Sequence, residues 1–214
     1  MISAVSPIRL RAQTPREPVR VVASFSILGD FVKNVGGDRV DVTTLVGPDS
    51  DVHVYVPPPA DARKIAGAKL IVINGLGLEG WLPRLLQLSG EKTPIVTATN
   101  GIAPLRLGSE ADPHAWQSVA NAKKYAANIR DGLIAVSPAD AELFVKNADA
   151  YLAKLDALDS EVRKAVAQIP QGKRKVISTH DAFGYFASAY GVQFIAPLGV
   201  STETEASAKD IARI

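Results

Sequence analysis

From Val19 onward, short apolar runs alternate along the chain with segments in which apolar residues recur every three or four positions. Apolar and β-branched runs bounded by turn residues indicate buried strands, whereas the longer spacing indicates helices. Strands that alternate with helices are typical of βαβ units. The pattern therefore predicts an α/β fold with mainly parallel sheets, and it places binding residues at the carboxyl ends of strands. The predicted strands cover residues 19–24, 40–46, 69–74, 94–98, 175–179 and 192–196, and the predicted helices cover 27–35, 60–66, 81–88 and 182–190, with another beginning near 205.

The segment from Ala139 to Ile169 has a helical pattern of unusual length. Its apolar residues follow spacings of three and four, charged residues separate them, and no glycine or proline interrupts the segment. Pro138 before it and Pro170 after it are start and stop signals. At about 1.5 Å of rise per residue, such a helix is longer than a small lobe is wide. We predict one linking helix that runs along or between two lobes.

This long helix divides the chain into parts. We expect an amino-terminal α/β lobe over 19–137, the linking helix over 138–170 and the start of a second α/β lobe over 171–214. Because only two strands are predicted after the helix and Ile214 falls within a predicted helix, we expect the second lobe to be truncated at that residue. Residues 1–18 are interpreted as a tail or the remnant of a processing site.

Composition excludes several classes of function. The chain carries 24 basic and 22 acidic residues, for a net charge of +2, so a nucleic acid is not an expected partner. The absence of cysteine removes disulfides, thiolate metal ligands, cysteine nucleophiles and a cysteine-linked lipid. No stretch approaches the ~18 to 20 apolar residues of a membrane-spanning helix, and residues 1–18 lack the apolar core of a signal peptide. Any metal site must therefore use nitrogen and oxygen ligands.

The three histidines of the chain have similar neighbours. Each lies where an apolar run changes to a polar turn, with a carboxylate one or two residues away and an aromatic residue two or three residues further on. One such histidine would more often be an ordinary surface or core residue, but three with the same neighbours favour a metal site. Neutral imidazoles bind a metal when the rings converge and a partner fixes each tautomer. The predicted ligands are His53, His114 and His180, and the carboxylates that could orient their rings are Asp51, Asp112 and Asp181, for which turn formation is the alternative role.

Zinc is the metal that this ligand set favours, because imidazole suits zinc whereas manganese prefers more oxygen. Three imidazoles with one carboxylate or water complete a tetrahedral zinc site. A three-histidine site with an open position could also activate water, so a zinc hydrolase is an alternative from a different class. That alternative needs a general base in a substrate pocket, and the sequence identifies neither.

Two further motifs are weaker. Gly75–Gly80 has the glycine spacing of a dinucleotide-binding turn, but no acidic residue follows at the distance that a ribose contact requires. We interpret it as a tight turn between a strand and a helix. Ser178, His180 and Asp181 are too close in sequence to form a hydrolase triad, and the chain has no G-x-S-x-G motif.

Six motifs in one order resemble those of the cluster A-I solute-binding proteins, which are the zinc and manganese receptors of ABC importers. They are VVASFSILGD at 21–30, DVHVYVP at 51–57, NGLGLEGW at 74–81, DPHAW at 112–116, STHDAFGYF at 178–186 and STETEASAKD at 201–210. The resemblance implies two α/β lobes joined by a long helix, with the metal held between the lobes by His53, His114 and His180.

The resemblance also implies a function. It predicts a periplasmic receptor, not an enzyme, that delivers its metal to the membrane permease of an ABC transporter, and we expect a monomer. Manganese receptors of the family tend to carry a carboxylate at the position of His180, which favours the zinc type. A manganese receptor or adhesin of the same family is the alternative. The family's fourth ligand is a carboxylate further along the chain, expected here beyond residue 214.

Overall fold

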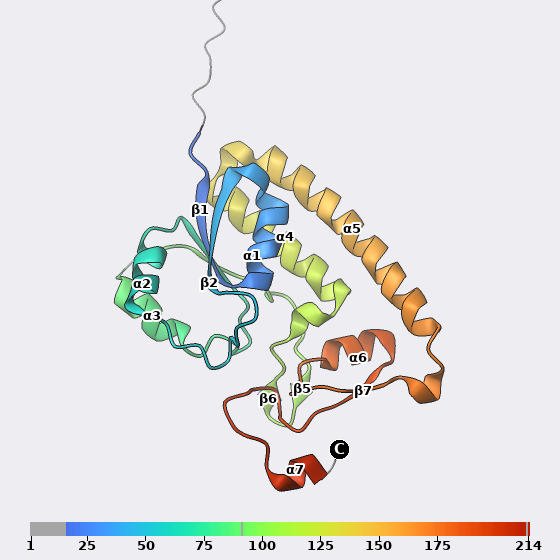
Figure 1. Cartoon of the computed structure of the whole chain (residues 1–214). Coiled ribbons are helices and arrows are strands. Elements are labelled where there is room, and N and C mark those ends of the chain that lie inside the picture. Colours follow the sequence, from blue (N-terminus) through green and yellow to red (C-terminus); the bar gives the residue numbers. More distant parts are fainter. Residues whose placement is uncertain (1–15, 91, 213) are drawn as a thin grey trace, which may run out of the picture.

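The structure is a computed structural model that describes residues 16–90, 92–212 and 214 (Figure 1). Residues 1–15 of the predicted tail lie outside the described residues. Four strands form a parallel sheet in the order β2-β1-β3-β4, which confirms the predicted parallel α/β arrangement. The strands are β1 (Val19–Phe25), β2 (Val40–Val46), β3 (Leu70–Ile73) and β4 (Ile95–Thr97).

Helices cover both faces of this sheet. Side chains alternate between the faces of a strand, so Val21 packs into one hydrophobic cluster and its neighbour Val22 into another. A sheet that is buried on both faces needs strands that are apolar almost throughout, which explains the continuous apolar run of β3 and the nearly continuous one of β1. The first cluster includes residues of α1 (Ser26–Gly36), α4 (Val119–Val136) and α5 (Ala141–Ala167), and the second includes residues of α2 (Pro59–Ala66) and α3 (Leu82–Ser89).

The helix predicted over 139–169 is α5. It spans 27 residues and follows a 3₁₀ turn at Pro138–Asp140. Its apolar side packs on α4 and α1, and it buries Phe144 and Ala148 completely. In Figure 1, α5 runs from the helices of the first sheet to the region of α6 and β7. The long helix therefore links the two parts of the chain, as predicted.

A second, two-stranded parallel sheet follows α5. It pairs β7 (Lys175–Ile177) with β8 (Gln193–Ile195), and α6 (Gly184–Tyr190) connects the two strands. A bridge between His180 and Leu198 prolongs the pairing beyond the strands. The last described helix is α7 (Ala208–Ala212). Since the two sheets do not pair with each other, we propose two lobes over 19–137 and 171–214, joined by the helical segment over 138–170.

Two parts of the fold have no counterpart among the predicted elements. One is α4, in which alanines occupy two of the buried positions, so the contrast between its buried and exposed faces is low. The other is the hairpin of β5 (Arg106–Leu107) and β6 (Glu110–Ala111), whose strands are too short to show a period. The hairpin ends three residues before His114 and α4 begins five residues after it, so the two flank the loop that carries this histidine.

The described part of the chain contains no helix with the length and apolar character that crossing a membrane requires.

Candidate metal centre

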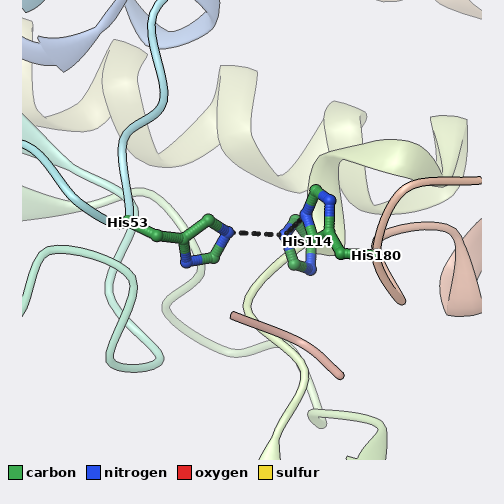
Figure 2. A group of neighbouring side chains, drawn as sticks. All are labelled: His53, His114 and His180. Atoms are coloured by element: carbon green, nitrogen blue, oxygen red, sulfur yellow. Dashed lines mark hydrogen bonds between the residues drawn. The ribbon is translucent and has the colours of Figure 1, made fainter. Parts of the chain in front are cut away.

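The structure brings the three predicted ligands together. His53 Nε2 lies 3.1 Å from His114 Nε2, and His180 Nε2 lies 3.3 Å from the same atom. Figure 2 shows the three rings meeting at their nitrogen atoms. Ligand nitrogens at about 2.0 to 2.1 Å from a tetrahedral zinc are about 3.3 Å from one another. The spacing of the rings therefore suits one small metal ion.

Each histidine comes from a different part of the fold. His53 lies in the loop between β2 and α2, His114 precedes the 3₁₀ turn Ala115–Gln117 that leads into α4, and His180 follows β7. His53 and His180 thus follow parallel strands, where side chains at the carboxyl ends converge. His114 is buried, whereas His53 and His180 are partly exposed. The centre lies between the first sheet and the segment after α5.

Asp112 holds the buried ring in place. Its Oδ1 accepts a hydrogen bond from the backbone N–H of His114 at 2.9 Å and lies 2.8 Å from His114 Nδ1. A proton on Nδ1 makes this second contact a hydrogen bond and leaves the lone pair of Nε2 free for a metal. Asp112 therefore has the geometry predicted for a carboxylate that orients a ligand.

The other two carboxylates are placed differently. Asp51 Oδ1 accepts a hydrogen bond from the backbone N–H of His53 at 2.9 Å, which fixes the turn rather than the ring. The backbone N–H of Asp181 lies 3.2 Å from the carbonyl oxygen of Leu198 and 3.0 Å from that of Gly199. His180 Nδ1 lies 3.4 Å from the hydroxyl of Thr179. The ring contact found at Asp112 is thus not repeated in these hydrogen bonds.

The aromatic neighbours also differ in their contacts. Trp116 packs edge-on against the ring of His114, with the centroids 5.3 Å apart. Tyr55 instead packs on Trp81, and Phe183 stacks on Phe194. The three histidines that share the sequence pattern thus lie together, although only part of the pattern reflects contacts with their rings.

The surroundings favour the neutral forms of His53 and His180. Burial, together with the neighbouring His114, lowers the pKa of His53 to about 4 against the raising effect of Asp51. Burial and His114 also lower the pKa of His180. Because a metal binds the neutral imidazole, both shifts favour the form that can ligate at neutral pH.

A buried polar network that the sequence did not predict supports the His114 loop. Glu79, which is buried, accepts hydrogen bonds from the hydroxyl of Ser24 at 2.6 Å and from the backbone N–H groups of Asn74 and Gly75 at 2.6 and 3.0 Å. The side-chain amide of Asn74 in turn donates to the carbonyl oxygen of Pro113 at 2.9 Å. This network connects the ends of β1 and β3 to the residue before His114.

Steric constraints explain why a glycine occupies position 75, at the start of the Gly75–Gly80 turn. Gly75 has φ of +85°, and a Cβ there would lie 2.5 Å from Cγ2 of Thr97 on the next strand. A side chain would therefore strain the backbone and collide with β4. This agrees with interpreting Gly75–Gly80 as a tight turn between strand and helix.

Replacing Asp112 with asparagine should weaken Zn²⁺ binding by about 10- to 100-fold, the usual effect of losing a carboxylate that orients a histidine ligand. The asparagine has nearly the same shape, so the fold should be retained. The affinity is measured by competition with a chelator. Asp41→Asn, at an exposed position in β2, is the matched control and should bind as the wild type does. Equal affinities for Asp112→Asn and the control would reduce Asp112 to a turn-forming residue.

Comparison with known proteins places the chain in a family. Residues 21–214 match the family described as ZnuA, zinc-uptake complex component A, periplasmic. The chain belongs to this family. The match confirms the resemblance to the metal receptors of ABC importers that the six motifs indicated.

Relatives of this ZnuA-family chain are named for different metals. The chain is 36% identical over 199 residues to the manganese-binding lipoprotein MntA of Halalkalibacterium halodurans. The match covers 92% of this chain and 66% of that protein. The chain is also 36% identical over 197 residues to the iron-binding protein YfeA of Yersinia pestis, with 88% and 63% covered. The solved periplasmic zinc-binding protein TroA of Treponema pallidum matches with a TM-score of 0.87 at 32% identity, covering 92% of this chain and 73% of that one. The chain spans about two thirds of the length of the curated relatives.

Proposed function

We propose that the protein is an extracytoplasmic receptor that binds a divalent transition metal and delivers it to the permease of an ABC transporter. The observation that carries this proposal is the convergence of His53, His114 and His180, which come from three distant segments. The Nε2 atom of His114 lies 3.1 Å from that of His53 and 3.3 Å from that of His180. In the described part of the chain, these histidines are the group of side chains that could hold an ion.

We propose Zn²⁺ as the preferred metal. The three described ligands are all imidazoles, which suit zinc, whereas manganese favours oxygen ligands. The relative TroA is named for zinc. MntA and YfeA are named for manganese and iron, so a manganese receptor of the same family is the competing assignment, and the two are separated by the titration described below.

The proposed location is the periplasm, which the family description supports. We propose that the protein acts as a monomer and that its partners are the metal and a membrane permease. A net charge of +2 gives no electrostatic reason to expect a nucleic acid. The relatives are named as binding proteins, so the zinc hydrolase alternative gains no support from them.

The test of the proposed function is a metal titration of the metal-free protein. We expect one Zn²⁺ per chain, bound more tightly than Mn²⁺ when both compete with a chelator. Zn²⁺ at about 1,000 times its Kd should stabilise the fold by about 4 kcal/mol, which raises Tm by about 8 to 16 °C for a chain of this size. Tighter binding of Mn²⁺ would overturn the zinc assignment, and a protein that takes up neither metal would overturn the receptor.

A further inference from the structure

Both carboxylate oxygens of Asp51 are engaged, and they connect distant segments. Oδ1 accepts a hydrogen bond from the backbone N–H of His53 at 2.9 Å. Oδ2 accepts one from the hydroxyl of Thr202 at 2.6 Å, across 151 positions of sequence. Thr202 lies in the loop between β8 and α7. Asp51 thus ties this loop to the turn that carries one of the three metal ligands.

The other end of the same loop holds a second ligand. Leu198 forms a bridge with His180, and the backbone N–H of Asp181 donates to the carbonyl oxygens of Leu198 and Gly199. We call residues 198–202 the strap. It is fixed to the His180 segment by backbone contacts and to the His53 turn by the side chain of Thr202.

The strap also borders a cavity next to the metal centre. This cavity has a volume of about 310 Å³, and its lining includes His53, Pro113, Val200 and Ser201. Pro113 precedes the buried ligand His114. The strap therefore lies close to His53, which is partly exposed.

A second connection between the two parts of the chain is of a different kind. The hydroxyl of Tyr185 on α6 donates to the carbonyl oxygen of Asp112 at 2.9 Å and accepts from the backbone N–H of Leu105 at 3.0 Å. Tyr185 is buried in the large hydrophobic cluster, so this contact cannot break without exposing apolar side chains to water. The contact between Thr202 and Asp51 lies at the surface and can break on its own.

We propose that Thr202 is a positioning residue that slows the release of the bound metal. This inference rests on the proposed function. An ion held by both His53 and His180 can leave only when at least one of these rings moves away. While the strap is fastened at both ends, the turn of His53 and the segment of His180 are tied together. Losing the hydroxyl of Thr202 frees one end of the strap and makes that movement easier.

The test compares the rate of Zn²⁺ release from the wild type with that of three variants. Thr202→Val removes the hydroxyl and keeps the shape of the side chain, Thr202→Ser keeps the hydroxyl, and Thr204→Val makes the same change at an exposed position two residues on. Release into an excess of a coloured chelator is followed by stopped flow. We expect Thr202→Val to release Zn²⁺ about three- to tenfold faster, the equivalent of one hydrogen bond. Thr202→Ser and Thr204→Val should match the wild type.

Thermal unfolding of the metal-free proteins separates this role from a general loss of stability. The contact is a single hydrogen bond worth about 0.5 to 1.5 kcal/mol, so Thr202→Val should lower the Tm of the metal-free protein by no more than about 6 °C. Thr202→Ser and Thr204→Val should unfold at the temperature of the wild type. If Thr202→Val released Zn²⁺ at the rate of the wild type, the role of the hydroxyl would be overturned. The same holds if Thr202→Ser released Zn²⁺ as fast as Thr202→Val. A wild type that holds neither Zn²⁺ nor Mn²⁺ would instead overturn the proposed function, and this inference with it.

Discussion

Replacing any one of His53, His114 and His180 with alanine is expected to lower the affinity for Zn²⁺ by more than about 100-fold. The loss of a residue that merely orients a ligand costs about 10- to 100-fold, and each of these changes removes a ligand itself. Water would have to take the place of the lost nitrogen. The largest effect is expected at His114, because it is buried and both of the other Nε2 atoms lie next to its own.

Competition with a chelator of known affinity measures each loss. Gln168→Ala, at the end of α5, serves as the control and should bind as tightly as the wild type. Circular dichroism and thermal unfolding of the metal-free variants show whether each is folded. A histidine variant that is folded and retains wild-type affinity would remove that residue from the ligand set.

Acidification is expected to weaken metal binding, but at a lower pH than unperturbed histidines would give. Protons bind only the metal-free rings, so affinity falls as the pH drops through each metal-free pKa. A ring with a pKa of ~6.5 would lose roughly 25-fold in affinity between pH 7 and pH 5. The pKa of His53 is lowered to about 4, so this ring should contribute almost nothing over that range. Its contribution should appear near pH 4.

Unperturbed histidine pKa values near ~6.5 would instead put the loss of affinity from all three rings between about pH 7 and pH 5. An NMR titration of the metal-free protein measures the pKa of His53 directly. Affinities from pH 7 to pH 4, determined with a chelator of known proton linkage, measure the consequence for binding. A His53 ring that titrates near its ordinary value would contradict the lowered pKa.

The same shift affects the stability of the metal-free fold. Between pH ~6.5 and the lowered pKa, the unfolded chain binds a proton at His53 that the folded chain does not. The contribution of His53 to the free energy of unfolding is therefore fully present above pH ~6.5, and it is lost as the pH falls towards 4. Metal-free protein should be less stable at pH 5 than at pH 7, and urea unfolding at the two values measures the difference.

Much of the fold follows from local pattern. The strand predicted over 40–46 is β2 to the residue, and the helix predicted over 139–169 is α5 with a 3₁₀ turn before it. The side-chain pattern of each segment is typical of only one type of secondary structure. α4 was not predicted, because its buried positions include the small residues Ala122 and Ala126, which contrast little with its exposed ones.

The sequence could suggest the candidate ligands, but not the contacts that hold them in place. Three histidines with similar neighbours could be recognised in the sequence, and the carboxyl ends of parallel strands provide a place for His53 and His180 to meet. The contact of Thr202 with Asp51 and the bond of Asn74 to Pro113 join residues 151 and 39 positions apart. Nothing in either local sequence marks such a partner, since each depends on how the elements pack.

The buried network at Glu79 makes the three candidate ligands unequal. His114 is anchored through Asp112, and the loop before it is anchored through Asn74 to the ends of two central strands. His53 is held by an exposed turn, and His180 by a backbone bridge to Leu198. The entropic cost of ordering a binding site is smallest where it is already rigid. We therefore expect an arriving ion to meet one preorganised side chain at His114, so that the loss of motion on binding falls on the other two.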